Sequence, residues 1–180
     1  MIKRIHILGA SGSGTTTLGK ELSKEIGYSH LDTDDYFWIK TNPPYTIKRP
    51  VEERVDLIRK DIKNNDRWIL TGSLCGWGDI FIPYFDLVVY LRIPKEIRMK
   101  RLLERENMRY GTEIEEGNVM YAAHREFMDW ASKYDDGDLD IRSKSLHYKW
   151  LEKLNCKVVR IEENIELKDK IKIIRKIIGL

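Results

Sequence analysis

The chain has 180 residues and a formal net charge of +3, a length that fits one domain with a full hydrophobic core. This charge and an isoelectric point near 8.7 are too low for a dedicated nucleic-acid-binding domain, for which a value above about 9 and a clustered basic face are expected. Cys75 and Cys156 have no zinc-ligand spacing around them, so neither a disulfide framework nor a zinc site is expected. No apolar run approaches the roughly 18 residues of a membrane span and no signal-type segment opens the chain, so we expect a cytoplasmic protein without a membrane partner.

A strand, a glycine-rich turn and a helix are predicted at the start of the chain, in that order. Apolar residues in the segment 2–8 are typical of a buried strand, and those in the segment 18–26 recur at helical spacing. Between them, residues 9–16 read Gly-Ala-Ser-Gly-Ser-Gly-Thr-Thr and fit the phosphate-binding pattern G-x-x-x-x-G-K-[ST], except that Thr15 stands in the lysine position. Glycines let successive backbone N–H groups face inward, and the helix start adds free N–H groups and the positive end of its dipole. The turn is therefore a candidate phosphate site.

The residues expected to bind a nucleoside triphosphate lie in this turn and in the first turn of the helix. They are Gly9, Ser11, Gly12, Ser13, Gly14, Thr15, Thr16 and Thr17. Thr16 occupies the position whose hydroxyl ligates Mg²⁺. Thr15 removes the positive charge that normally reaches the β- and γ-phosphates, so either another basic residue supplies it or phosphoryl transfer is weak. A connector without a ligand is the alternative, and the strand–turn–helix order favours the phosphate site.

Alternating strands and helices are predicted for the rest of the chain, with an irregular aromatic and proline-rich loop over residues 36–50. The further predicted strands are residues 28–31, 68–71, 86–91 and 157–161. The further predicted helices are residues 51–64, 95–109, 119–134, 142–154 and 165–178, the last one capped by Asn164. Five short strands alternating with helices predict an α/β protein with a parallel sheet covered on both faces.

Asp32, Asp34 and Asp35 follow the predicted strand 28–31, at the edge where doubly wound folds bind ligands. Carboxylates there can hold Mg²⁺ through water or accept a proton from an attacking hydroxyl. Turn and helix-capping roles are the alternative, because aspartate favours both. We interpret Asp32 and Asp34 as functional and leave Asp35 unassigned.

Four arginines recur along the predicted helix 95–109, at positions Arg98, Arg101, Arg105 and Arg109. Their spacing puts them on one stripe of the helix, from which they could reach a common ligand. Arginine guanidinium groups clamp the charged oxygens of a transferring phosphoryl group. A solvated face paired with neighbouring glutamates is the alternative. Among the histidines, His6 is predicted as a core residue, and His30, His124 and His147 have no metal-ligand spacing and receive no role.

The pattern resembles the nucleoside-monophosphate-kinase-like group of P-loop kinases, which includes adenylate, cytidylate and shikimate kinases. The resemblance rests on the loop 9–16, the aspartates after the second strand, residues 68–73 (Trp-Ile-Leu-Thr-Gly-Ser), the strand-plus-arginine segment 86–105 and the closing strand–helix pair. It implies a three-layer α/β/α P-loop NTPase fold with a five-stranded parallel sheet of order 2-3-1-4-5 and a helical lid. Residues 1–180 would form one kinase domain, with an acceptor-binding insert at about 36–66 and a lid at about 107–145. The loop sequence Gly-Ser-Gly-Thr-Thr-Thr is also similar to that of some archaeal-type cytidylate kinases.

For the site, the resemblance implies a kinase that uses ATP and Mg²⁺. Asp32 and Asp34 match a D-x-D that binds acceptor and metal water in shikimate kinases, so Asp32 joins Thr16 as a metal residue. Arg101 and Arg105 match the R-x-x-x-R at the lid entrance and are the arginines implied to neutralise the transferring charge. Arg125 and Arg142 fall in the lid segment, where surface placement is favoured over further phosphate contacts.

The acceptor expected from the resemblance is a nucleotide or a nucleoside. One departure weakens this expectation, because residues 71–75 read Thr-Gly-Ser-Leu-Cys where adenylate kinases have D-G-F-P-R. The magnesium-associated aspartate and the acceptor-phosphate arginine of that motif are therefore absent. A kinase for another hydroxylated metabolite, such as a shikimate-like compound, and a nucleotide-binding protein with weak or no transfer are the alternatives.

Overall fold

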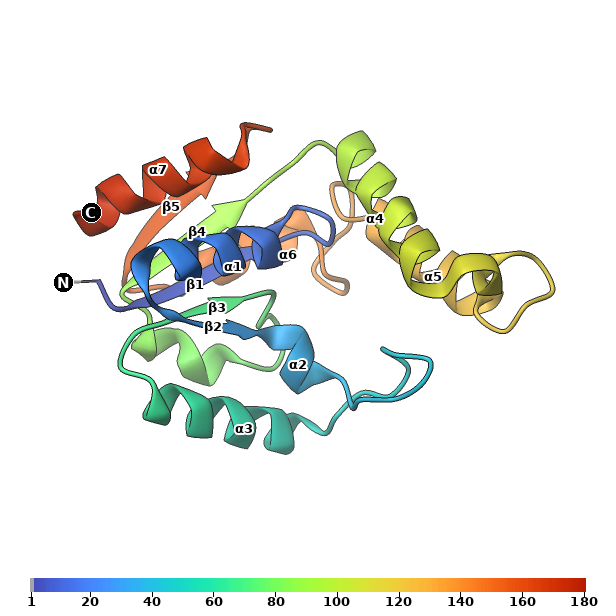
Figure 1. The fold of residues 1–180 in the computed structure, drawn as a ribbon, viewed down its shortest axis with the longest axis horizontal. Coiled ribbons are helices and arrows are strands. Elements are labelled where there is room, and N and C mark those ends of the chain that lie inside the picture. The colour runs from blue at the N-terminus through green and yellow to red at the C-terminus, as the bar shows by residue number, and fades with distance from the viewer. Residues whose placement is uncertain (1) are drawn as a thin grey trace.

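The computed structural model describes residues 2–180 and contains a five-stranded, all-parallel sheet with helices on both faces (Figure 1). The strands are β1 (Arg4–Gly9), β2 (Ser29–Asp32), β3 (Trp68–Thr71), β4 (Leu87–Leu91) and β5 (Lys157–Ile161). Their spatial order, β2-β3-β1-β4-β5, confirms the expected order, with β1 paired to β3 on one side and to β4 on the other. Because all strands are parallel, their carboxyl ends meet at one edge of the sheet.

Helices make the connections between the strands. They are α1 (Thr15–Ile26), α2 (Thr33–Phe37), α3 (Val51–Asn64), α4 (Lys95–Tyr110), α5 (Tyr121–Ser132), α6 (Lys144–Leu151) and α7 (Leu167–Ile178), with 3₁₀ helices η1 (Asp79–Tyr84) and η2 (Gly111–Ile114). The short helix α2 was not predicted; it forms because the Asp32 carboxylate accepts a hydrogen bond from the backbone N–H of Asp34. The last helix begins at Leu167, so Asn164 does not cap it and that expectation is wrong. Among the described helices, none is both long and apolar enough to cross a bilayer.

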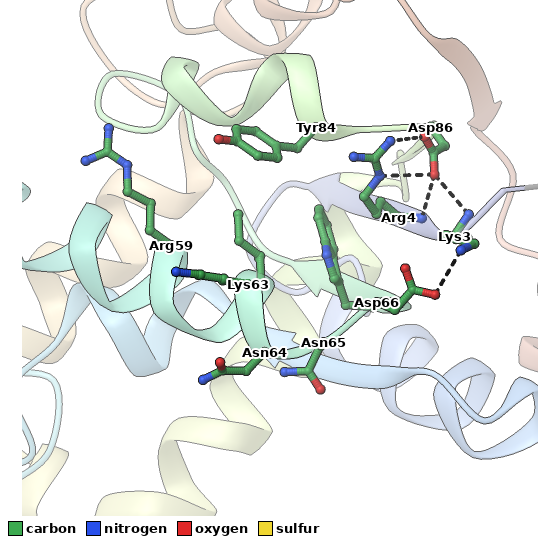
Figure 2. Close-up of a pocket in the computed structure, with 11 residues that line it drawn as sticks. Lys3, Arg4, Arg59, Lys63, Asn64, Asn65, Asp66, Tyr84 and Asp86 are labelled. Carbon is green, nitrogen blue, oxygen red and sulfur yellow. Dashed lines mark hydrogen bonds and ion pairs between the residues drawn. The ribbon is translucent and has the colours of Figure 1, made fainter.

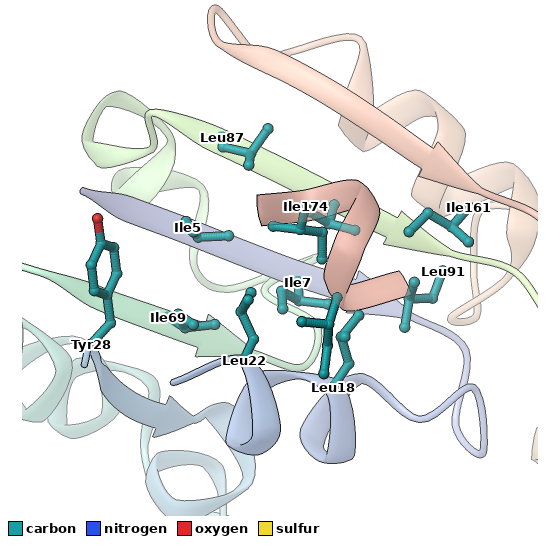
Figure 3. Packing of buried hydrophobic residues seen from close by; sticks show 12 residues of the cluster. Ile5, Ile7, Leu18, Leu22, Tyr28, Ile69, Leu87, Leu91, Ile161 and Ile174 are labelled. Carbon is teal, nitrogen blue, oxygen red and sulfur yellow. The ribbon is translucent and has the colours of Figure 1, made fainter. Parts of the chain in front are cut away.

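Two apolar clusters fill the two faces of the sheet. The first includes Ile5 and Ile7 of β1 and packs against α1 and α7 (Figure 3). The second includes Leu8 of β1 and packs against side chains of α3, η1 and α6. Successive side chains of a strand point to opposite faces. A sheet covered on both faces therefore buries nearly every residue of its central strands, as in β1 from Ile5 to Gly9 and in the whole of β4.

Helices α4 and α5, with η2 between them, extend beside the carboxyl edge of the sheet (Figure 1). The segment expected as the lid, residues 107–145, includes the end of α4 together with η2 and α5. The Tyr110 hydroxyl at the end of α4 donates to the Pro44 carbonyl at 3.1 Å. The Arg109 guanidinium lies 4.2 Å from the centroid of the Tyr45 ring. The lid thus contacts the loop that precedes α3, which lies in the expected acceptor-binding insert, and the expected boundaries of insert and lid stay predictions.

His6 is a buried residue of β1, which confirms its prediction as a core residue. Its Nδ1–H donates to the Leu70 carbonyl at 2.9 Å, and its ring stacks on Phe85 with centroids 4.8 Å apart. Burial lowers the pKa of His6 to about 4 and that of the buried His147 to about 3. Both imidazoles are therefore neutral in the folded protein at neutral pH.

We expect these histidines to make folding less favourable in mild acid. Below the unfolded pKa of about 6.5 the unfolded chain binds protons that folded His6 does not bind until about pH 4, so stability is lost as the pH falls through that window. From about pH 7.5 to about pH 5 this amounts to roughly 2 kcal/mol of unfolding free energy for His6. Urea unfolding at the two pH values measures it. In His6→Phe, whatever its absolute stability, the loss of unfolding free energy between the two pH values should be smaller by roughly that amount. An unchanged loss would contradict the lowered pKa of His6.

Candidate active site

The loop between β1 and α1 is curled tightly against the sheet and against α4. Gly12 and Gly14 have positive φ values of 81° and 91°, a region that L-residues with side chains rarely adopt. A Cβ on Gly9 would lie 2.5 Å from the Leu91 carbonyl oxygen, and one on Gly12 would lie 2.8 Å from the Arg98 carbonyl oxygen. Glycine is thus needed at these three positions for conformation, for space, or for both.

The curled loop presents backbone N–H groups at the start of α1. Its own backbone hydrogen bonds run from Ser13 N to Ala10 O at 3.0 Å and from Leu18 N to Gly14 O at 2.9 Å. Within residues 2–180, the N–H groups of residues 14–16 have no acceptor, as expected for the first turn of a helix. Ser13 is buried and its N–H is already bonded to Ala10, so its expected contact with a nucleotide stays a prediction. Free N–H groups at the positive end of the helix dipole form an anion site.

Thr16 and Asp32 lie in direct contact. The Thr16 Oγ1 hydroxyl donates to Asp32 Oδ2 at 2.7 Å, and Asp32 Oδ1 accepts from the Asp34 N–H at 3.0 Å. Hydroxyl and carboxylate oxygens suit Mg²⁺, which takes one or two carboxylates together with substrate phosphates and water rather than a full protein cage. No group of three or more His, Cys, Asp or Glu ligands occurs in the described part of the chain. Thr16 and Asp32 therefore fit the expected metal position.

Asp34 lies in the first turn of α2, where its side chain stays accessible to water. Surrounding protein raises the pKa of Asp34 by desolvation, and the negative charge of Asp32 raises it further. The positive charges of Arg142, Arg105 and Arg109 act in the opposite direction. One carboxylate of the predicted D-x-D thus contacts the phosphate loop through Thr16, and the other lies within the electrostatic reach of three arginines.

Arg105 and Arg142 are held by two neighbouring aromatic rings of α5. The Arg105 guanidinium lies 5.7 Å from the Phe127 centroid, the Arg142 guanidinium lies 5.4 Å from the Trp130 centroid, and the two rings are 5.9 Å apart. Neither guanidinium makes an ion pair or a hydrogen bond within residues 2–180, and Arg105 Nε is buried without a partner. Burial lowers the pKa of both groups. Their N–H donors are thus available to a ligand that carries anionic oxygens.

The placement of Arg142 corrects the expectation of a surface residue. It is partly buried, because stacking on Trp130 keeps it beside the sheet, and the charge of Asp34 acts on it. The sequence contained no local signal for this, since Arg142 precedes α6 without any periodic pattern. Arg125 shows only a ring contact, with its guanidinium 5.9 Å from the Tyr121 centroid.

The expected stripe of four arginines does not converge on one point. Arg98 is buried and donates to Asp135 at 2.7 Å and to the Ser11 carbonyl at 3.3 Å. Arg101 is exposed and donates to Asn164 Oδ1 at 3.4 Å. At about 100° per residue, Arg101 is rotated roughly 60° from Arg98 around the helix axis, and the core packs on one side of the stripe. The role predicted for Arg101 stays a prediction, and Arg105 is the arginine of the R-x-x-x-R that faces Asp34.

A cavity of about 890 Å³ lies at the opposite, amino end of the strands (Figure 2). Figure 2 shows Lys3 turned toward Asp66 and Arg4 turned toward Asp86, and these ion pairs measure 2.8 Å and 2.7 Å. The charges that face this cavity near β1 are therefore neutralised within the protein. The phosphate loop lies at the other edge of the sheet, so this cavity takes no part in the candidate active site.

Comparison with known proteins identifies the family of the chain. Residues 5–121 match the family described as AAA domain. The chain belongs to this AAA-domain family. It is 47% identical to the uncharacterized protein YqaC of Bacillus subtilis over 95% of this chain and 94% of that protein. It is 27% identical to a cytidylate kinase of Thermococcus sibiricus over 81% of this chain and 80% of that protein.

Solved structures of kinases share the fold of this AAA-domain protein. A shikimate kinase from Acinetobacter baumannii in complex with shikimate aligns with a TM-score of 0.58 at 18% identity, over 99% of this chain and 94% of that chain. A deoxyadenosine kinase from M. mycoides with bound products aligns with a TM-score of 0.52 at 17% identity, over 98% of each chain. The family match and the relatives show that the protein is a P-loop protein of the nucleoside-monophosphate-kinase-like group. The solved structures show that it has the three-layer α/β/α fold.

Proposed function

We propose that this P-loop protein is an ATP-dependent phosphotransferase that acts on a small-molecule acceptor, in the first place a nucleotide or a nucleoside. The observation that carries the proposal is the 2.7 Å hydrogen bond from Thr16 to Asp32. It joins the phosphate loop to the acidic end of β2, so that a donor phosphate on the loop would lie next to Asp34. The similarity to cytidylate kinases supports the choice of a nucleotide acceptor.

In this proposal, residues of the chain bind the donor phosphates, orient the acceptor and accept its proton. The N–H groups of residues 14–16 bind the donor phosphates, and Thr16 with Asp32 would hold Mg²⁺, which would supply charge neutralisation when bound. With a nucleoside or another hydroxyl acceptor, Asp34 accepts the hydroxyl proton while the new oxygen–phosphorus bond forms and the bond from phosphorus to the leaving ADP oxygen breaks; with a nucleotide acceptor, the attacking phosphate oxygen is already anionic and needs no base. The raised pKa of Asp34 brings it closer to the pH at which a general base works best.

Arg105 replaces the missing loop lysine in the same proposal. Thr15 leaves the loop without a side-chain cation. Arg105 lies within electrostatic reach of Asp34 and has no anionic partner of its own in the described chain. Its guanidinium would neutralise charge that develops on the transferring phosphoryl group. Arg142, on the next aromatic ring, would bind an anionic oxygen of the acceptor.

We further propose that this reaction takes place in the cytoplasm, where ATP is supplied and where the two free cysteines would stay reduced.

A second function is favoured by one observation, the threonine at position 15. If no cation reaches the phosphates during turnover, the protein would bind nucleotide with little transfer. Calorimetric titration with ATP, together with an ADP-release assay across nucleoside monophosphates, nucleosides and hydroxylated acids, separates the two functions. Acceptor-dependent ADP release supports the kinase. Tight ATP binding without release on any acceptor in the presence of Mg²⁺ favours the nucleotide-binding protein.

Thr16→Ala should lower Mg²⁺-dependent kcat by at least about 10-fold, the scale for disturbing a metal site, while the ATP dissociation constant changes by less than about threefold. The reason is that the hydroxyl serves the metal, whereas the backbone N–H groups bind the phosphates. Thr16→Ser is the matched control, because it keeps the hydroxyl and should retain most of the turnover. Equal losses of kcat and ATP affinity in Thr16→Ala would contradict this division of roles.

A further inference from the structure

The segment between α2 and α3 forms an arm that reaches the end of α4. Residues 38–48, which we call the arm, fold back on themselves, and the Ile39 N–H donates to the Ile47 carbonyl at 2.9 Å. Figure 1 shows this segment extending away from α2 on the side of the molecule where α5 lies. Because α2 contains Asp34 and ends just before the arm, the arm continues directly from the element that carries the proposed base.

The tip of the arm makes two contacts with the end of α4. The Tyr110 hydroxyl donates to the Pro44 carbonyl at 3.1 Å, and the Arg109 guanidinium lies 4.2 Å from the centroid of the Tyr45 ring. A guanidinium within about 6 Å of an aromatic centroid is attracted to the negative face of the ring. The Tyr45 hydroxyl has no hydrogen-bond partner among residues 2–180. The ring of Tyr45, and not its hydroxyl, therefore makes the contact with α4.

Tyr45 has an unusual backbone conformation. Its φ is 63°, and within the described chain no other residue except glycine has a positive φ. This left-handed region is unfavourable for a residue with a Cβ. Such residues persist where the surrounding contacts enforce the conformation, and they are frequent at ligand clamps and active sites. In the arm, the Thr41 and Thr46 hydroxyls both donate to the Pro43 carbonyl, at 2.9 Å and 3.2 Å, and these bonds fix the turn that presents Tyr45 to α4.

Helix α4 is anchored at two places, and Arg105 lies between them. Near the start of the helix, the buried Arg98 donates to Asp135 at 2.7 Å. Arg109, one helical turn beyond Arg105, contacts the arm. Among the helices and strands, α4 packs chiefly against η2 and α5, which in turn pack chiefly against α4. The direction of the second half of α4, and with it the place of Arg105, therefore depends on the contact that Arg109 makes.

Arg105 lies close enough to both partners of this contact for their charges to act on it. Burial has the largest effect and lowers the pKa of Arg105, and the positive charge of Arg109 lowers it further. Glu106, Asp34 and Tyr45 act in the opposite direction. Tyr45 and Arg109 thus lie around the same space as Arg105 and the proposed base.

We propose that Tyr45 is a positioning residue for the cation that takes part in phosphoryl transfer: its ring holds Arg109, so that the second half of α4 keeps Arg105 beside the phosphates on the loop. This inference rests on the proposed function, in which Arg105 supplies the charge that the loop lacks at Thr15. A lysine in the loop would be held by the loop itself. A cation on α4 is held only as firmly as α4 is, so the arm contributes to transfer without contacting the phosphates.

The first test measures how firmly α4 is held and requires no turnover. Spin labels are introduced through a non-natural amino acid at Met108 of α4 and Lys24 of α1, both of which are exposed, and pulsed EPR without added ligand gives their distance distribution. We expect one narrow distribution in the otherwise unchanged chain and in Tyr45→Phe, which keeps the ring. In Tyr45→Leu, which keeps an apolar side chain but has no aromatic face, the distribution should broaden. An unchanged distribution in Tyr45→Leu would overturn the proposal.

Tyr45→Gly separates positioning from folding. Glycine adopts a φ of 63° without strain, so this variant should unfold at a temperature close to that of the wild type. It lacks the ring, however, and its distance distribution should broaden as in Tyr45→Leu. A narrow distribution in folded Tyr45→Gly would also count against a positioning role for the ring.

The second test measures kcat with an acceptor that supports ADP release. Tyr45→Leu should lower kcat about 5- to 30-fold, the factor that corresponds to a cation–π contact of about 1–2 kcal/mol. The ATP dissociation constant should stay within about threefold of wild type, and so should kcat in Tyr45→Phe, because the phosphate loop and the aromatic face are kept. In the Arg105→Ala background, Tyr45→Leu should lower kcat by less than about twofold, because Tyr45 acts through Arg105. An equal loss in both backgrounds would show that the two residues act independently and would overturn the proposal.

The two tests distinguish the failure of this inference from the failure of the proposed function. If no acceptor supports ADP release, the kinase proposal fails, whereas the distance distributions still show whether Tyr45 holds α4. If ADP is released and Tyr45→Leu keeps the kcat of the wild type, the kinase proposal stands and the role of Tyr45 is excluded.

Discussion

Asp34→Asn is expected to lower kcat by about 10²- to 10⁴-fold, the contribution of a positioned general base, and to leave the ATP dissociation constant within about threefold of wild type. Asparagine has nearly the same shape but cannot accept the proton of the acceptor hydroxyl. The ATP site is formed by the loop backbone and by Thr16 with Asp32, so it does not depend on this side chain. Steady-state kinetics with the best hydroxyl acceptor of the panel, together with calorimetry for ATP, measures both quantities.

The pH dependence of kcat provides a second readout for Asp34. Its pKa is raised by desolvation and by Asp32. The deprotonated form is the active one, so kcat should increase as the pH rises through this raised pKa, and this acidic limb should be absent in Asp34→Asn. Asp35→Asn is the matched control, because Asp35 is the neighbouring carboxylate in the first turn of α2 and has no role in the proposed reaction. A similar loss of kcat in both variants, or near-wild-type turnover in Asp34→Asn, would remove Asp34 as the base.

Arg105→Ala is expected to lower kcat by at least about 10²-fold, the scale for losing one donor to developing charge. The chain has no lysine in its phosphate loop, and the Arg105 guanidinium, stacked near Phe127, has no anionic partner in the described residues. Because it makes no ion pair there, its removal should cost little folding stability. Arg101→Ala is the matched comparison on the same helix, and its effect should be smaller, since Arg101 contacts Asn164.

Thr15→Lys tests the same compensation from the other direction. If Arg105 already neutralises the phosphate charge, a lysine at position 15 should change kcat by less than about 10-fold, because the electrostatic role is filled. A gain of orders of magnitude in Thr15→Lys, together with near-wild-type turnover in Arg105→Ala, would show that Arg105 does not compensate. The protein would then be better described as a nucleotide-binding protein or a weakened kinase.

Local sequence patterns determined the framework of this protein. Helix α3 and strands β3 and β5 begin and end where apolar periodicity predicted them, at residues 51–64, 68–71 and 157–161. The spacing of apolar residues shows which side of a segment packs against the core. It can therefore be recognised without knowing which other segment that side contacts. The phosphate loop was equally readable, because its glycines are required by positive φ values and close backbone approach within one short segment.

The tertiary structure alone decided which charged groups meet. Helical spacing grouped four arginines, but only folding buried Arg98 against Asp135, left Arg101 exposed and brought Arg105 within electrostatic reach of Asp34. Arg142 joined the site through a ring on α5, and the contact of Thr16 with Asp32 depends on the end of β2 lying beside the start of α1. The position of a residue along a helix determines the direction in which its side chain leaves the helix axis. The group that this side chain contacts depends on segments that are distant in sequence and are brought together only by packing.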